Sequence, residues 1–358
     1  MALALPNVNQ LTMERPTLST IAQNLDKEGK WISLVAEVLM KSNAILPDIP
    51  MVEANSFLEH MSTYEISMPK AFFYEFNRGI PASYGENGQQ RETLSQFSSR
   101  SEIDSQLYEL NNNGPQWRFD QDKRHIRALN DAMTETVFYG DQGKNPLSFN
   151  GLATRYNMLD PKVSQKASQV KSLGGKKGKR LSSIYAVSWG ETTCHGLYPK
   201  GGKGTLDYKD RGEIFVDDGA GRRFAAYVSE YFWRFGIAVP DYRSVVRICN
   251  IDIEDVLAGK GMGTGKLDAE GATNILLEIN NALRNLDPTN SGGKKVLYAN
   301  KDVIACLQNC AIRSDATQVR FTEVLADNKS DSNVQEFNFN GYTLKRCDSI
   351  SSDEDEVK

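Results

Sequence analysis

The chain has 358 residues, of which 40% are hydrophobic and 25% are charged; these are the proportions of a folded globular protein, not of a disordered or fibrous one. Lys and Arg number 42 against 46 Asp and Glu, and the resulting net charge of −4 argues against a protein that coats nucleic acid with its whole surface. No apolar run approaches the roughly 18 residues of a membrane span, and the first ten residues lack the basic start of a secretory signal.

The first fifty residues read as an arm. Within residues 27–43, Trp31, Leu34 and Val38 recur at helical spacing, which predicts a short amphipathic helix that ends before Pro47. The pattern does not decide whether this helix packs on its own chain or on a neighbour.

A long hairpin is predicted next. The run HMSTYEISM starting at His60 and the run RETLSQFSS starting at Arg91 are both compatible with strands, and turn signals lie between them at Asn77-Arg78-Gly79 and around Gly85. The apolar content of this region is too small for the hairpin to bury itself, so we expect it to lean on something else. An ordinary hairpin packed on its own domain is the alternative.

A charged amphipathic helix is predicted over 119–139, because Ile126, Leu129, Met133 and Val137 recur every three or four residues. Residues 160–180 follow as a basic linker with no acid after Asp160. This linker is either a solvated loop or a segment that contacts phosphate or an acidic neighbour.

Mostly strand material fills 184–252, where aromatic and β-branched residues alternate with polar ones and predict half-buried antiparallel strands. Helices are predicted over 269–285 and 301–311, with a strand at 295–300 between them. The dipeptide Asn340-Gly341 predicts a hairpin turn, and the acidic tail from Ser351 is expected to be disordered.

Sequence signals for chemistry are weak. The three histidines, His60, His125 and His195, are far apart, and Cys306 and Cys310 are spaced to share one apolar helix face, where packing is favoured over metal binding. The glycine–lysine run 259–266 departs from the phosphate-binding loop because Lys260 replaces its first glycine and Leu267 its hydroxyl residue. No catalytic, cofactor-binding or metal-ligating residue is therefore predicted.

Several short motifs occur in an order that resembles one protein family. They are Asn43 to Asp48, Met68-Pro69, Asn77 to Ile80, Glu102 to Asp104, Asn145 to Ala153, Trp189-Gly190, His195 to Lys200, Trp233, Asp241, Arg243, Val246 to Asp252, Leu297 to Asn300, and Gly341 to Ile350. Together they resemble the major capsid protein of tailed double-stranded DNA bacteriophages, in the branch of short-tailed phages related to epsilon15. Each motif alone is weak, whereas their succession over nearly the whole chain is specific.

The resemblance implies an α+β protein with the Hong Kong 97-like capsid fold. It implies an N-terminal arm over 1–50, an extended β-hairpin loop over 51–104, a peripheral domain with a spine helix over 105–145, an axial domain over 146–335, C-terminal strands over 336–352 and an acidic tail over 353–358. Little chain remains beyond Ile350, although the familiar version of this fold has peripheral-domain strands at the C-terminus. We therefore hypothesise that strands within about 212–252 supply part of that sheet, in a rearranged chain order.

The resemblance also implies a structural protein, not an enzyme, that self-assembles into hexamers and pentamers of the icosahedral head around the phage DNA genome. Its implied partners are further copies of itself, packaged double-stranded DNA held without sequence preference on the inner face, a cement or decoration protein, a scaffold and the portal, with no membrane and no cofactor. The expected location is the virion capsid, after assembly in the host bacterial cytoplasm.

Two alternatives are another virion protein (a portal or tail tube protein) and, less favoured, a nucleotide-dependent enzyme. Some family members cross-link their shells through a lysine of the extended loop. Lys70 lies in that region, but no motif fixes its partner, so no cross-link is predicted.

Overall fold

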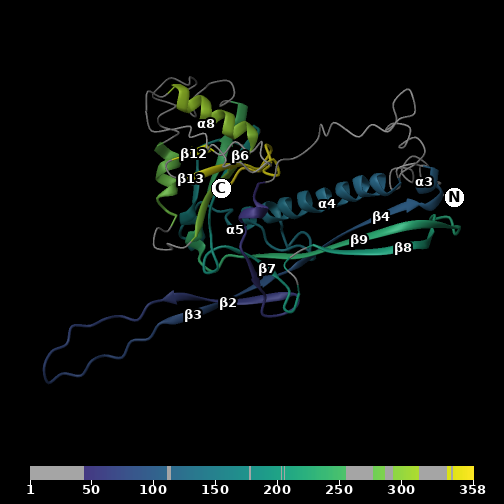
Figure 1. Ribbon diagram of the computed structural model, residues 1–358. Helices are drawn as coiled ribbons and strands as arrows, with labels where there is room; N and C mark the ends of the chain where they lie inside the picture. Colours follow the sequence, from purple (N-terminus) through teal and green to yellow (C-terminus); the bar gives the residue numbers. More distant parts are fainter. Residues whose placement is uncertain are drawn as a thin grey trace, which may run out of the picture. The chain divides into compact units, whose positions relative to one another are not determined.

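The computed structural model describes residues 44–110, 114–176, 179–202, 204, 206–254, 277–286, 293–313, 337–339 and 342–358 (Figure 1). The predicted arm helix over 27–43, the glycine–lysine run 259–266 and the first part of the helix expected over 269–285 lie outside these residues. In the part that is described, no helix combines the length and apolar character that crossing a membrane requires. Contacts divide the chain into two compact units, the first containing Gln96–Ala132 and Thr205–Trp233 and the second the remainder from Lys41 onward.

The first unit is built around the N-terminal part of a long helix. The helix α4 spans Gly114–Tyr139, so it begins earlier than predicted and ends at the predicted residue. Trp117 is fully buried and packs with Ile103, which belongs to the strand β4 (Ser95–Asp104). The short helix α3 (Ser105–Leu110) connects β4 to the segment before α4.

Two long strands complete the first unit. The strand β8 (Asp207–Asp217) pairs antiparallel with β9 (Arg223–Ala238), from Asp207 opposite Phe232 to Asp217 opposite Arg223. Arg118 of α4 donates to the Asp210 carboxylate at 2.6 Å and to the Ser229 hydroxyl at 3.0 Å, which ties the helix to both strands.

The second unit contains a six-stranded sheet in the order β12-β13-β11-β6-β10-β5. The strands are β5 (Val170–Ser172), β6 (Leu181–Trp189), β10 (Val245–Asp252), β11 (Lys294–Ala299), β12 (Phe337–Phe339) and β13 (Tyr342–Arg346). The central strand β6 pairs antiparallel with both β10 and β11, whereas β5 and β13 join the sheet in parallel. The expected C-terminal hairpin is confirmed, since β12 and β13 are antiparallel neighbours.

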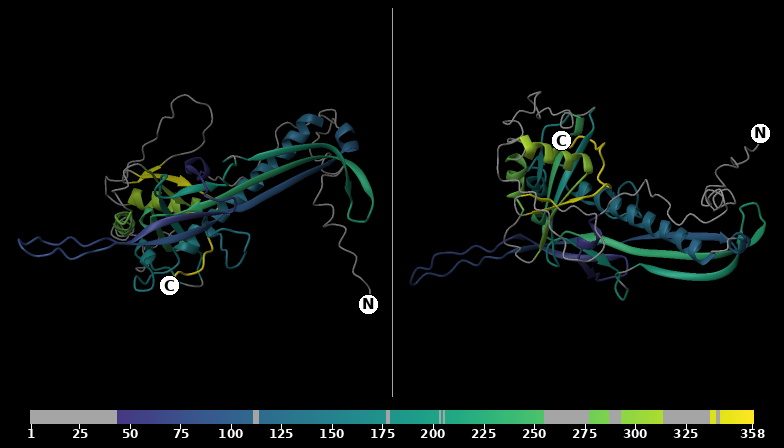
Figure 2. Two further views of the ribbon diagram at one scale, coloured as in Figure 1. Left: turned by 90° about the horizontal axis from the view of Figure 1, so that it is seen from below. Right: turned by 45° about the horizontal axis from the view of Figure 1, so that its top comes forward.

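Both β6 and β10 are buried along their entire length, which corrects the prediction of half-buried strands for these two segments, whereas β8 and β9 mix buried and exposed residues. On one face, Ile184 and Val246 belong to a core that includes Leu307 of the helix α8 (Lys301–Arg313). On the other face, Tyr185 lies 5.0 Å from the ring of Phe138, near the C-terminal end of α4. A sheet with both faces covered hides its serines as well as its aliphatic side chains, so alternation underestimates its burial. The two views of Figure 2 show α8 lying against the sheet.

Shorter elements surround this sheet. They are β1 (Met51–Glu53), which is parallel to β7 (His195–Tyr198), the helix α5 (Leu152–Arg155), and the 3-10 helices η1 (Leu46–Asp48), η2 (Gln165–Gln169) and η3 (Tyr242–Ser244). The final residues of β9 pair antiparallel with β7, so β9 contributes to both units. Of the hypothesised peripheral strands, β8 and β9 up to Trp233 cluster with Gln96–Ala132, while β10 belongs to the six-stranded sheet.

Candidate functional site

The strands β2 (Glu59–Ser67) and β3 (Glu86–Thr93) form a two-stranded sheet of their own. The ladder is antiparallel and runs from Glu59 opposite Thr93 to Ser67 opposite Glu86. Figures 1 and 2 show this hairpin leaving the rest of the second unit. The predicted hairpin is confirmed, but its second strand starts at Glu86, and most of the run from Arg91 to Ser99 is divided between β3 and β4.

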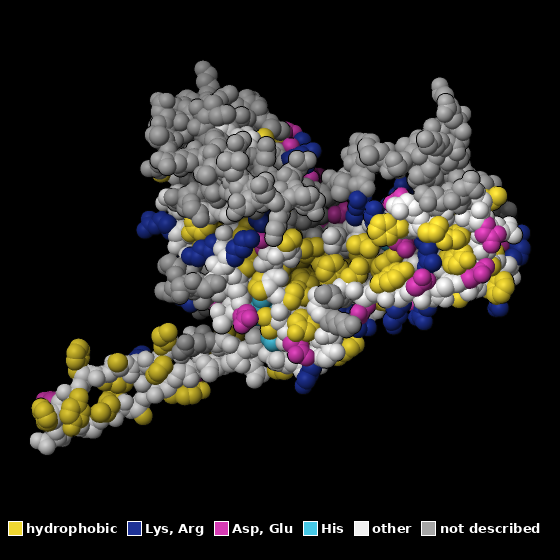
Figure 3. Space-filling view, viewed as in Figure 1, with side chains coloured by type: hydrophobic (Ala, Val, Ile, Leu, Met, Phe, Trp, Pro, Cys, Tyr) yellow, Lys and Arg dark blue, Asp and Glu magenta, His cyan; other side chains and the backbone are white. Residues whose placement is uncertain are grey.

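The segment that joins β2 to β3, residues 68–85, exposes large apolar side chains. Met68, Phe73, Tyr74, Phe76, Ile80 and Tyr84 each expose 62% or more of their surface. Figure 3 shows hydrophobic side chains, in yellow, along the projecting hairpin. Because an isolated hairpin is marginal in water and a contiguous apolar patch usually marks a binding surface, this segment (the loop tip) is the best candidate for a contact with another protein.

A buried ion pair fixes the base of the hairpin. Arg155 of α5 donates to both carboxylate oxygens of Glu92 in β3 at 2.5 Å, and the two side chains are only 6% and 5% exposed. Arg155 also donates to the carbonyls of Asn150 and Ile237. Burial alone would lower the pKa of Arg155, but the bonds to Glu92 outweigh it and the pKa is raised. The Arg155 guanidinium therefore remains protonated, and its two hydrogen bonds to the Glu92 carboxylate fix the orientation of the two side chains.

A second buried cluster anchors the turn that precedes β1. Asp48 of η1 accepts hydrogen bonds from Lys294 at 2.7 Å, from Lys345 at 2.9 Å and from the Tyr298 hydroxyl at 2.8 Å. Tyr298 in turn accepts from the Trp189 indole at 2.8 Å. Burial would raise the pKa of Asp48, but these three donors outweigh it and the pKa is lowered. The carboxylate therefore remains ionised and joins η1 to β11, β13 and β6.

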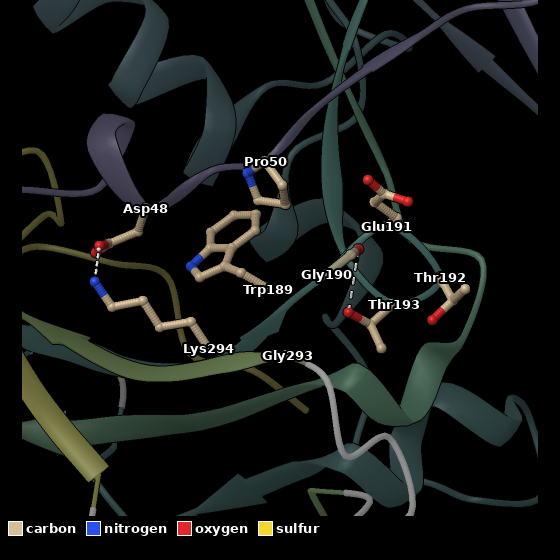
Figure 4. Close-up of a pocket in the computed structure, with 9 residues that line it drawn as sticks. All are labelled: Asp48, Pro50, Trp189, Gly190, Glu191, Thr192, Thr193, Gly293 and Lys294. Carbon is tan, nitrogen blue, oxygen red and sulfur yellow. Dashed lines mark hydrogen bonds and ion pairs between the residues drawn. The ribbon is translucent and has the colours of Figure 1, made fainter.

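A pocket opens beside this cluster (Figure 4). It has a volume of about 470 Å³, and Asp48, Trp189, Glu191, Thr193 and Lys294 are among its lining residues. Both Asp48 oxygens are already engaged, and Thr193 donates to the Ser188 carbonyl. Asp48 and Thr193 are therefore held by contacts within the fold.

The C-terminal tail is ordered, which corrects the expectation of a disordered acidic tail. Glu354 accepts from Arg247 at 2.7 Å and from the Tyr139 hydroxyl at 2.5 Å, and the Glu354 and Arg247 side chains are each only 5% exposed. Asn250, which adopts a positive φ of 57°, exchanges two hydrogen bonds with the backbone of Val357. Acidic composition indicates solvation only where no buried cation is available, and Arg247 supplies one.

The basic linker is also more ordered than a solvated loop. Residues 165–169 form η2 and residues 170–172 form β5, which pairs with β10. Lys179 forms an ion pair with the buried Asp252 at 2.6 Å, as the alternative of an acidic neighbour predicted. Lys162, Lys171 and Lys176 are exposed.

Motif reasoning missed these ionic contacts. Cys306 is buried among apolar side chains of the α8 core, as predicted, while the Cys310 side chain lies outside the described residues. Among the described residues, no group of three or more His, Cys, Asp and Glu side chains could hold a metal ion. The pairs of Glu92 with Arg155 and Asp48 with Lys345 join residues far apart in sequence, so no local spacing signals them.

One family model matches the chain over nearly its whole length. The model of the family described as major capsid protein GP7 matches residues 26–358. The structure is similar to a chain of bacteriophage epsilon15, with a TM-score of 0.70 and 24% identity over 96% of this chain and 97% of that chain. A chain of the bacteriophage JBD30 capsid follows, with a TM-score of 0.49 and 14% identity over 97% of this chain and 99% of that chain. No curated protein matches the sequence.

The family match covers almost the entire chain, and the likeness to the epsilon15 chain shows the Hong Kong 97-like fold that the motifs implied. The loop tip and its ion-paired base are consistent with a protein that completes its contacts in an assembly. The chain thus belongs to the major capsid protein GP7 family, and it is a structural protein of the bacteriophage virion capsid that assembles with copies of itself.

Proposed function

We propose that copies of this chain form hexamers and pentamers that together build an icosahedral head around a double-stranded DNA genome. The observation that carries the proposal is the loop tip, whose large apolar side chains are exposed in the single chain. Covering them requires a protein surface, and in a shell of identical chains a neighbouring copy supplies it through a heterologous contact. The β2–β3 hairpin is then the extended loop of the fold.

The first unit corresponds in this proposal to most of the peripheral domain. α4 is its spine helix, and β8 with β9 up to Trp233 supplies strands that the familiar fold takes from the C-terminus. Clustering of Thr205–Trp233 with Gln96–Ala132 supports this rearranged chain order. The six-stranded sheet and α8 then form the axial domain.

The exposed lysines of the basic linker are proposed to face the packaged DNA. Three exposed lysines, Lys162, Lys171 and Lys176, would contact phosphate groups of the DNA backbone. Such contacts are independent of base sequence, because lysine neutralises the backbone without contacting the base edges. A shell that is filled after assembly also needs an opening and a means of setting its size. These needs support a portal and a scaffold as partners, with a cement protein as a further one and the host bacterial cytoplasm as the place of assembly.

The proposal is tested by electron microscopy of the full-length chain expressed in bacteria. The informative variant replaces three apolar side chains of the loop tip: Phe73→Ser, Phe76→Ser and Ile80→Ser. The matched control replaces three exposed apolar side chains elsewhere in the second unit: Leu147→Ser, Val163→Ser and Leu277→Ser. Both sets add the same hydroxyl groups and leave the ion pairs intact.

The wild-type chain and the control should form spherical shells, whereas the loop-tip variant should remain as subunits or capsomers. Shells formed equally well by the loop-tip variant would contradict the proposed role of the loop. Rings of twelve subunits or open tubes from the wild-type chain would instead favour a portal or tail tube protein.

A further inference from the structure

Two histidines meet where the β2–β3 hairpin leaves the rest of the second unit. His60 lies near the start of β2, directly opposite Glu92 of β3. His195 is the first residue of β7 and lies opposite Ala238 of β9. The two ring centroids are 6.2 Å apart and the ring planes are nearly perpendicular, at 89°. The contact therefore joins the hairpin to a strand of the neighbouring sheet.

This pair lacks the hydrogen bonds that buried imidazoles normally form. His195 is 3% exposed, and among the described residues no hydrogen bond of normal geometry reaches either of its ring nitrogens, although the backbone of Gly190 lies near enough to favour the protonated ring to a smaller extent than burial opposes it. Nδ1 of His60 is also buried without a hydrogen-bond partner among the described residues. A neutral ring always carries one N–H donor, and a protonated ring carries two donors and a charge. Protonation would therefore add a charge and a second donor to a buried ring, and this would raise the free energy of the site further.

The surroundings keep both rings uncharged near neutral pH. Burial, and then the proximity of His60, lowers the pKa of His195 to about 4. Burial also lowers the pKa of His60, although the charge of Glu92 acts in the opposite direction. Desolvation is thus the dominant cause at both rings.

The charged neighbours offer little compensation for a new positive charge. Glu92 is the acid whose charge reaches both rings, but its oxygens already accept from Arg155, and Oε1 also accepts from Gln90. Burial lowers the pKa of Lys166, and the nearby positive charge of Arg155 lowers it further. Arg234 lies 5.0 Å from the ring of Phe57, just before β2. Cys194 is buried, and burial raises the pKa of its thiol, so it supplies no anion.

We propose that the contact between His60 and His195 is an acid-sensitive latch at the base of the extended loop. When either ring takes up a proton, the two rings separate and become hydrated, and the hairpin is free to change its angle to the rest of the second unit. The consequence for a shell rests on the proposed function of the loop, but the chemistry of the latch does not.

The direction of the pH effect follows from proton binding. In the open form the rings are hydrated and titrate near the ordinary value of 6.5, whereas His195 in the closed form titrates near 4. Below pH 6.5 the open form binds more protons, so the closed form is disfavoured by about tenfold for each further unit of pH, until the pKa near 4 is reached. Above pH 6.5 the latch contributes no pH dependence.

The first test is an NMR titration of the histidine ring carbons in the full-length, unassembled subunit. The His195 ring should titrate well below pH 6, and its signal should shift when His60→Phe removes the neighbouring imidazole. A His195 ring that titrates at the ordinary value of 6.5 would overturn the latch. This readout does not depend on assembly, so it stands even where the proposed function fails.

The second test is hydrogen exchange of β2 and β3 between pH 7 and pH 4, expressed as protection factors that remove the intrinsic pH dependence. Wild-type protection should fall by up to about 300-fold over this range, which is about tenfold for each unit of pH between 6.5 and 4. The double variant His60→Phe/His195→Phe keeps two aromatic rings without a titratable group and should stay nearly constant, while the control His125→Asn should behave like wild type. Equal losses of protection in wild type and in the double variant would contradict the proposal.

Discussion

Glu354 and Arg247 are 107 residues apart in sequence, and they form an ion pair of 2.7 Å from which water is almost excluded. The pair fixes the C-terminal tail against β10. Ser183 of β6 donates a further bond to the same carboxylate at 2.5 Å. Loss of one partner from such a pair leaves a buried charge without compensation, which is far more costly than loss of an exposed pair.

We predict that Glu354→Gln destabilises the subunit by about 3 kcal/mol, at the lower end of the range for a broken buried pair because the amide still accepts and donates hydrogen bonds. Asp355→Asn removes the neighbouring carboxylate, which is exposed, and should change stability by less than about 0.5 kcal/mol. Urea unfolding of the full-length subunit measures both values. Equal midpoints for the two variants would show that the tail contributes nothing to the fold.

The base of the extended loop gives a second prediction. Arg155→Lys keeps the positive charge but loses the bidentate geometry and the bonds to the Asn150 and Ile237 carbonyls. We expect a loss of about 2 kcal/mol or more in unfolding experiments, because buried acceptors are left unpaired. Arg91→Lys, at an exposed residue with a 3.5 Å contact to Glu59, is the control and should be nearly silent. An Arg155→Lys variant as stable as the wild type would mean that the positive charge alone, without the bidentate geometry, stabilises the base of the loop.

Asp48 predicts a pH dependence of stability. Its pKa is lowered in the folded chain from the ordinary 3.8, so its stabilising effect is complete above that value and disappears as the pH falls through the lower folded-state pKa. The stability advantage of wild type over Asp48→Asn should therefore be constant near neutral pH and shrink below pH 3.8. Denaturant midpoints of both proteins across this range provide the measurement. An advantage that disappears already at pH 6 would point to a different titrating group.

The basic linker makes a prediction for DNA. Replacing Lys162, Lys171 and Lys176 by Gln should weaken binding of assembled shells or subunits to duplexes of any sequence. The slope of log affinity against log salt should become shallower by up to about 2.7, which is 0.9 for each of three phosphate contacts. A charge-matched control with Lys144→Gln, Lys200→Gln and Lys209→Gln tests whether total charge explains the effect. Identical slopes for the two triple variants would contradict a specific role for the linker.

Local periodicity predicted the regular elements well. The spacing of Leu129, Met133 and Val137 identified α4 and its end at Tyr139, because one helix face must be apolar wherever a helix packs. The helix that begins at Lys301 and the strand before it were also predicted. The start of α4 was predicted too late because Trp117, its first buried anchor, lies before the clearest part of the pattern.

The sequence could not indicate which charges are buried. Asp48 sits among prolines and aliphatic residues in a short motif, but its partners Lys294 and Lys345 arrive from strands at the other end of the chain. Glu354 belongs to a run that is acidic enough to look solvated, and nothing in that run indicates Arg247. Contacts that form only in the folded chain determine whether these charged side chains are buried, whereas the exposed character of the loop tip follows directly from its composition.

The cluster at Asp48 has a mechanical consequence. The chain enters η1 directly from the residues that precede Ala44, and β1 is held to β7 by a ladder of only three residue pairs, from Met51 to Glu53. Tension applied along the N-terminal segment would thus reach one carboxylate before it loads the strands. Two lysines and a tyrosine would share that tension among β11 and β13, so the first step of forced detachment should be rupture of charge contacts rather than unzipping of the sheet. Because Asp48 and Lys345 are buried, added salt should weaken this anchor much less than it weakens exposed ion pairs.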